Sequence, residues 1–184
     1  MSVHLDRRAT PWTFIYVIGA IGGVQKMGQT ASPQVRLLQL RRLVGDDLTI
    51  HTTERVSHQL ARGTEQRAHQ ILAPWKVSNE LFDVPAPWAV MAVQQAAQET
   101  PRLYLSTSQV RAAKLPLGWS FTVFSARTQL STQTLGQAMR QDREWPAVDL
   151  ASMLAIRRTL EAANIEFISE NGGGIGVRLR KLAP

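Results

Sequence analysis

Apolar and polar positions in the first part of the chain alternate in short blocks that predict a small sheet with helices. Residues 14–18 form an apolar, β-branched and aromatic run, which is typical of a buried strand. Glycines in residues 19–23 turn the chain, and residues 24–28 predict a second strand that pairs with the first as a hairpin. Ser32 and Pro33 then fit the N-cap and first turn of a helix over residues 33–44.

The pattern continues with a third strand over residues 48–53. Residues 54–72 have a helical composition except for Gly63, so we expect two helical pieces with a break near that glycine. Residues 80–84 predict a short fourth strand, which the following prolines end. These elements together indicate a small antiparallel sheet flanked by helices.

A helix over residues 88–98 has a strong apolar face. Glu99, Thr100 and Pro101 follow it and are typical of a boundary between domains. We therefore expect two domains, residues 1–100 and residues 101–184.

The second half predicts a mostly helical domain. Its expected helices are residues 107–115, 121–127, 131–139 and 150–163. About three residues separate the second helix from the third, which is the spacing of a helix-turn-helix. Residues 165–169 and 177–179, joined through the glycines of residues 171–174, predict a C-terminal β-hairpin. The whole chain is therefore expected to have an α+β fold.

Composition and charge narrow the class of partner. The chain has 184 residues, of which 44% are hydrophobic and 19% charged, as in soluble globular proteins. The net charge is +7, with +2 in residues 1–100 (10 Lys/Arg, 8 Asp/Glu) and +5 in residues 101–184 (11 and 6). This balance favours an anionic partner and makes the second half the more basic one.

Two further features exclude other classes of protein. Cysteine is absent, which excludes disulfides and thiolate zinc sites. The longest apolar run near the start is too short to span a bilayer, and residues 1–10 lack the order of a signal peptide. We expect a cytoplasmic protein without a membrane partner.

Three side chains in the first half can meet at one point. Tyr16 and Lys26 lie on adjacent predicted strands, and Arg36 lies one turn into the following helix. A hydroxyl, an ammonium and a guanidinium that converge in this way suit a phosphate group.

These residues belong to a pattern that resembles the GIY-YIG nuclease family, in particular its compact phage and bacterial branch. The similar pieces are Ile15-Tyr16-Val17, Lys26-Met27-Gly28, Arg36, Glu65 with His69 four residues later, and Asn79-Glu80-Leu81-Phe82. They occur in the family's order and extend over residues 12–84. The second tyrosine of the family is replaced here by Lys26, as is common in this branch.

The resemblance implies metal-dependent cleavage of phosphodiester bonds. Glu65 would hold one Mg²⁺ or Mn²⁺, and Arg36 would hold a nonbridging phosphate oxygen. The proton of the attacking water would pass to Tyr16 or to His69, and the resemblance favours Tyr16. Lys26 is then a phosphate contact rather than a base.

Each of these residues also has an ordinary structural interpretation. Tyr16 could be a core tyrosine, and Arg36 and Glu65 could form surface ion pairs. His69 could equally be a packing or surface histidine, while Asn79 and Glu80 could position water or simply begin a strand. Arg41 and Arg42 either extend a DNA-binding positive face beside Arg36 or solvate their helix.

The second half resembles a Cro/repressor-type (XRE) helix-turn-helix domain. The similar pieces are RAAKLPLGWS, STQTLGQAMRQ and the closing RRTLEAANIEFISENGGGIGVRLRK. Gln129 stands where such turns often have glycine, and Gly136 weakens the expected recognition helix by roughly 1 kcal/mol relative to Ala. The residues of this region that can contact bases and phosphates are Thr132, Gln133, Gln137 and Arg140.

The combined expectation is a metal-dependent endonuclease that acts on double-stranded DNA and is targeted by its helix-turn-helix domain. The alternative is a DNA-binding transcriptional regulator whose nuclease-like domain is catalytically inactive. Action on RNA is a third, weaker possibility.

Overall fold

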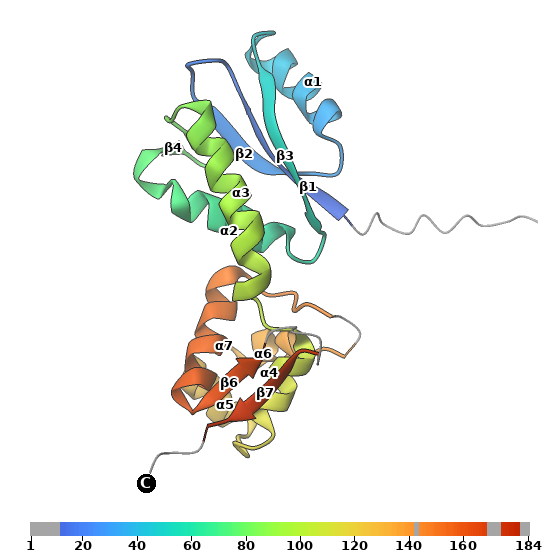
Figure 1. Cartoon of the computed structure of the whole chain (residues 1–184), viewed down its shortest axis with the longest axis vertical. Coiled ribbons are helices and arrows are strands. Elements are labelled where there is room, and N and C mark those ends of the chain that lie inside the picture. Colours follow the sequence, from blue (N-terminus) through green and yellow to red (C-terminus); the bar gives the residue numbers. More distant parts are fainter. Residues whose placement is uncertain (1–11, 142–143, 169–173, 181–184) are drawn as a thin grey trace, which may run out of the picture. The chain divides into compact units, whose positions relative to one another are not determined.

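The computed structural model describes residues 12–141, 144–168 and 174–180. The chain divides into two compact units, Met1–Gln98 (unit 1) and Glu99–Pro184 (unit 2). Both strands and helices are present, and every strand pairing is antiparallel, so the fold class is α+β as predicted (Figure 1). No helix in the described ranges is long and apolar enough to cross a membrane.

Unit 1 is built on one antiparallel sheet with the strand order β3-β1-β2-β5-β4. Its strands are β1 (Trp12–Gly19), β2 (Gln25–Thr30), β3 (Thr49–Ser57), β4 (Lys76–Ser78) and β5 (Leu81–Phe82). The predicted hairpin is confirmed, because β1 and β2 pair in a register that sets Tyr16 opposite Gly28. Successive side chains of β1 point to opposite faces, so the sheet can bury an apolar layer on each side.

Helices cover both faces of this sheet (Figure 1). Helix α1 (Pro33–Val44) packs against Tyr16 and Ile18 through Leu40. Helices α2 (Ala61–Ile71) and α3 (Ala86–Leu103) cover the face of β1 that carries Ile15 and Val17. The last turn of α3 belongs to unit 2.

Several predicted boundaries in unit 1 are wrong. Residues 54–57 were expected to be helical, but they extend β3, because Glu54 and Arg55 pair with Ile15 and Phe14 along the long strand β1. Helix α2 runs through Gly63 without the expected break. The strand expected over residues 80–84 is only Leu81–Phe82, and it pairs with β4, which the pattern did not predict.

The end of α3 also differs from the expectation. The helix continues through Pro101 to Leu103 instead of stopping at residue 98. A proline inside a helix removes one backbone donor and crowds the preceding turn. Pro101 lies in the last turn of α3, where the helix ends two residues later, so this disruption falls at the end of the helix.

Unit 2 consists of short helices and one hairpin. The helices are α4 (Thr107–Lys114), α5 (Phe121–Thr128), α6 (Thr132–Ala138) and α7 (Leu150–Ala162). Strands β6 (Ile165–Ile168) and β7 (Gly176–Leu179) pair antiparallel, as predicted, while residues 171–173 of the expected glycine turn lie outside the described residues. Phe124, Leu135 and Ile156 are fully buried and fill the interior between these helices.

The turn between α5 and α6 has the backbone that the sequence pattern requires. Gln129 ends α5 in the left-handed conformation, with φ 57° and ψ 28°. Glycine adopts this conformation without cost, which is why such turns favour it. Ser131 then caps α6 by accepting a hydrogen bond from the backbone N–H of Thr134 at 3.0 Å.

Candidate functional site

The hydroxyl of Tyr16 lies directly over Gly28 on the neighbouring strand. A Cβ atom at position 28 would stand 2.8 Å from the Tyr16 oxygen and 3.0 Å from the ring carbon that bears it. Real Cβ contacts are not this short, so any side chain at position 28 would push the tyrosine away. Position 28 therefore needs a residue without a side chain, so that the Tyr16 ring can extend from β1 over the neighbouring strand β2.

Arg36 reaches the same point from α1. Its Nε donates a hydrogen bond to the Tyr16 hydroxyl at 3.1 Å, and its guanidinium carbon lies 6.0 Å from the centroid of the ring. Nη1 makes only a long contact of 3.5 Å with Gln39. The tyrosine is 1% exposed, whereas Arg36 is half-buried. The structure thus brings together two of the predicted catalytic residues.

Lys26 on β2 and Glu80 in the turn between β4 and β5 form an ion pair. The Lys26 ammonium lies 2.5 Å from Oε2 of Glu80, which directly precedes β5. Glu80, for which the sequence left two interpretations, therefore fixes the position of Lys26. The neighbouring Asn79 is exposed in the turn between β4 and β5, with a φ of 26°.

Glu65 lies on α2 and is half-buried. Burial raises the pKa of its carboxyl above the ordinary 4.5, and the negative charge of Glu80 raises it further. A hydrogen bond of 2.9 Å from the Gln29 amide, together with the charges of Lys26 and Arg62, opposes this rise in pKa. Two carboxylates and a lysine therefore share one electrostatic neighbourhood.

His69 follows Glu65 by one turn of α2 and is half-buried. Its ring packs on Phe82, with centroids 5.0 Å apart. Burial lowers the pKa of the imidazole below the ordinary 6.5; Lys76 and Lys26 lower it further, while a backbone hydrogen bond with Met27 and the charge of Glu80 raise it. Within the described part of the chain, Nε2 is buried without a hydrogen-bond partner. This environment favours a packing role over proton transfer.

The remaining arginines of α1 have different surroundings. Arg41 donates from Nε and Nη2 to the carbonyl of Leu48, at 3.0 and 2.8 Å. This contact joins the end of α1 to the segment before β3, so the Arg41 guanidinium is engaged within the protein. Arg42 is exposed on the same helix.

The predicted DNA-contacting residues of unit 2 share an exposed surface. Thr132, Gln133 and Gln137 are exposed on α6, and Arg140 is exposed just after that helix. The opposite side of α6 carries Leu135 and Ala138, which are fully buried. The helix therefore presents hydroxyl and amide groups outward, which are the groups that can donate to and accept from base edges.

The sequence pattern does not predict one hydrogen bond of the site, the bond between Gln29 and Glu65. Gln29 was assigned no role, yet its amide holds the Glu65 carboxylate. The available signal was the position of Gln29, one residue beyond the Lys26-Met27-Gly28 segment on the same strand.

The donor set suits one kind of metal ion better than others. Among the described residues, no group of three or more histidine, aspartate or glutamate side chains could hold a metal. Mg²⁺ and Mn²⁺ are commonly held by one or two carboxylates and keep several waters, which they share with a phosphate. The carboxylates of Glu65 and Glu80 are of the chemical type that such a partly hydrated ion takes, and two carboxylates alone do not make a closed zinc site.

No protein-family model, curated protein or solved structure matches this chain. Its function is accordingly inferred from the residues and contacts described above.

Proposed function

We propose that the protein is a metal-dependent DNA endonuclease in which unit 1 hydrolyses phosphodiester bonds and unit 2 binds double-stranded DNA. One observation carries the proposal: the Tyr16 hydroxyl and the Arg36 guanidinium are in contact above Gly28. All three positions belong to the pieces that carry the sequence resemblance to GIY-YIG nucleases.

In the proposed reaction, Arg36 binds a nonbridging oxygen of the scissile phosphate through the outer edge of its guanidinium. Its Nε donates a hydrogen bond to the Tyr16 oxygen, which accepts the proton of the attacking water while the phenol's own proton passes to solvent. The new bond forms between the water oxygen and phosphorus, the bond to the leaving sugar oxygen breaks, and that oxygen takes up a proton from solvent. Lys26, held by Glu80, adds positive charge beside the phosphate.

Glu65 and Glu80 are the proposed ligands of a divalent cation. When bound, the cation supplies neutralisation of the phosphate charge. Gln29 orients the Glu65 carboxylate through its amide. The raised pKa of Glu65 is consistent with this role, because a carboxyl that lies near a second carboxylate gains most from a cation.

Unit 2 supports the targeting part of the proposal through its charge and through α6. Residues 101–184 carry +5 of the total charge of +7, which favours binding to a phosphate backbone. The exposed glutamines of α6 can read base edges in a major groove.

The test is cleavage of supercoiled plasmid by the purified protein with Mg²⁺ or Mn²⁺. Nicked or linear product is expected with metal and none with EDTA. Glu65→Gln, which keeps the shape of the side chain, should abolish cleavage without unfolding the protein. Plasmid that stays supercoiled with either metal over a wide range of protein concentrations would exclude the nuclease function.

A second candidate is a DNA-binding regulator in which unit 1 does not cleave. It is favoured by one observation, the 1% exposure of Tyr16, since a catalytic phenol must reach a water molecule. DNA binding that is unaffected by Tyr16→Phe, combined with an absence of cleavage in the unmodified protein, would support this candidate.

A further inference from the structure

Unit 2 contains a hollow that neither proposed activity uses. Its volume is about 430 Å³, within the range of pockets that hold small molecules in proteins. The lining residues are Pro101, Arg102, Tyr104, Leu105, Gln109, Glu144, Trp145, Arg157, Phe167 and Ile175. They come from the end of α3, from α4 and α7, from the segment before α7 and from the hairpin.

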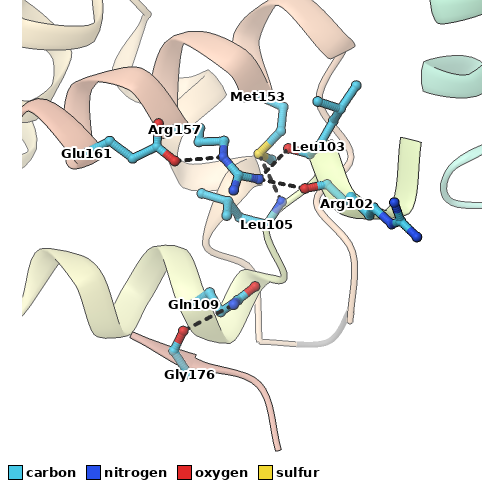
Figure 2. A network of polar contacts seen from close by, with 8 residues as sticks. All are labelled: Arg102, Leu103, Leu105, Gln109, Met153, Arg157, Glu161 and Gly176. Atoms are coloured by element: carbon cyan, nitrogen blue, oxygen red, sulfur yellow. Dashed lines mark hydrogen bonds and ion pairs between the residues drawn. The ribbon is translucent and has the colours of Figure 1, made fainter. Parts of the chain in front are cut away.

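A polar network holds the walls of this hollow in place (Figure 2). From α7, Arg157 donates through Nη1 to the carbonyl of Arg102 at 2.6 Å and through Nε to Glu161 at 2.9 Å. From α4, the Gln109 amide donates to the carbonyls of Ile168 and Gly176, both at 3.2 Å, which fixes the two strands of the hairpin. The hollow is therefore bounded by elements that are tied to one another.

The walls are mainly aromatic and aliphatic. Tyr104, Trp145 and Phe167 contribute rings, and the Arg157 guanidinium carbon lies 5.6 Å from the centroid of the Phe167 ring. The Tyr104 hydroxyl donates to the carbonyl of Val148 at 3.1 Å, which leaves its ring as a wall. Surfaces of this kind suit a flat apolar body, since aromatic rings pack favourably face to edge or offset.

Two opposite charges on the lining have no ion-pair partner among the residues that the structure describes. The charge of Arg157 is balanced by Glu161. Within the described residues, neither the Arg102 guanidinium nor the Glu144 carboxylate takes part in an ion pair. A purely anionic ligand would meet Glu144 and a purely cationic one would meet Arg102, whereas a zwitterion satisfies both.

We propose that this hollow binds a free aromatic amino acid, with its ring between Trp145 and Phe167, its carboxylate at Arg102 and its ammonium at Glu144. The ligand would bridge the helices and the hairpin, so its binding should stabilise unit 2. The proposal does not depend on whether unit 1 cleaves nucleic acid.

The experiment titrates the full-length, isotope-labelled protein with three matched probes and follows the backbone amide signals by NMR. The probes are L-phenylalanine, 3-phenylpropanoate, which lacks the ammonium group, and 2-phenylethylamine, which lacks the carboxylate. L-Phenylalanine should give saturable shifts at Leu105, Phe167 and Ile175. It should bind about tenfold or more tightly than either truncated probe.

Two variants and a control test whether Arg102 contacts the carboxylate of the ligand and Glu144 its ammonium group. Arg102→Ala should weaken L-phenylalanine about tenfold and leave 2-phenylethylamine unchanged, and Glu144→Gln should weaken L-phenylalanine but not 3-phenylpropanoate. Arg158→Ala, which changes an exposed arginine of α7 outside the lining, should bind like the unmodified protein. The proposal is overturned by an absence of saturation up to about 10 mM, by shifts that map outside the lining, or by equal affinity for all three probes.

Discussion

The Nε atom of Arg36 donates a hydrogen bond to the hydroxyl of Tyr16 at 3.1 Å, so α1 and β1 are joined by their two most functionally suggestive side chains. The bond uses the inner edge of the guanidinium. The outer edge is what can hold two phosphate oxygens at once, which an ammonium group cannot imitate.

Arg36→Lys is therefore expected to reduce cleavage by about 10²-fold or more, because both the bidentate contact and the bond to Tyr16 are lost. The measurement is the single-turnover rate of plasmid cleavage at saturating protein. Arg42→Lys is the matched control, since Arg42 is exposed on the same helix and keeps its charge. Equal losses in both variants would mean that only the general positive charge of α1 matters.

Gly28→Ala should destabilise unit 1 by about 1–3 kcal/mol, because its Cβ would lie 2.8 Å from the Tyr16 oxygen and force the ring to move. Gly136→Ala is the control, because a Cβ there would meet no atom within 4 Å apart from its chain neighbours and the backbone of its own helix. Because alanine also favours a helix over glycine, this control should gain about 0.5–1 kcal/mol. Urea unfolding measures both, and a neutral Gly28→Ala would show that the phenol is not held over the hairpin.

The parts of this arrangement differ in how well the sequence predicts them. The alternation in residues 14–18 and the glycines after it predict the hairpin, and Ser32 with Pro33 predicts the start of α1. These are local signals. The extension of β3 through Glu54 and Arg55 is not local, since only pairing with β1 overrides their helical composition.

The contacts that complete the site are also non-local. Gln29 meets Glu65 across 36 residues, and Lys26 meets Glu80 across 54. No spacing rule connects positions this far apart, because the fold of the sheet and α2 decides which side chains meet. The resemblance to a nuclease family was needed to select Glu65 among the acidic residues of the chain.

The raised pKa of Glu65 predicts how stability changes with pH in the absence of metal. Between the ordinary value of 4.5 and the raised value, the folded protein binds more protons than the unfolded chain. The contribution of Glu65 to stability therefore falls as pH rises through this window. Glu65→Gln removes the effect, so its stability relative to the unmodified protein should be higher at about pH 7 than at about pH 4.

Urea unfolding in EDTA at the two pH values measures this difference. Asp46→Asn, which changes an exposed carboxylate in the turn after α1, serves as the control. A difference for Glu65→Gln that is the same at both pH values would mean that this carboxyl is not buried in solution.

His69→Gln should reduce cleavage by less than about tenfold, whereas loss of a general base typically costs about 10²–10⁴-fold. The reason is the buried Nε2 and the packing of the ring on Phe82. The lowered pKa adds a second readout. Stability from a neutral buried histidine is present above pH 6.5 and is lost as pH falls from 6.5 toward the lowered pKa.

The two measurements for His69 are single-turnover cleavage and urea unfolding. The unmodified protein should lose more stability than His69→Gln between about pH 7.5 and about pH 5.5. If His69→Gln lost as much cleavage as Arg36→Lys and kept the stability of the unmodified protein, His69 would be a catalytic residue.

The last prediction separates sequence recognition from general affinity in unit 2. Gln133 and Gln137 are exposed amides on α6, suited to the edge of an adenine base, while Arg140 carries a charge suited to a phosphate. Alanine at either glutamine should reduce discrimination between the preferred site and a mismatched site by about 1–3 kcal/mol. The affinity for random DNA should change little. Arg140→Ala should weaken binding to all sequences and make the negative slope of log K against log salt shallower by about 0.9. Binding is measured in EDTA by fluorescence anisotropy over a salt series, with Gln94→Ala on α3 as the control. If the glutamine variants keep full discrimination and Arg140→Ala keeps the original salt slope, α6 does not contact DNA, and its exposed face is then available for a protein partner.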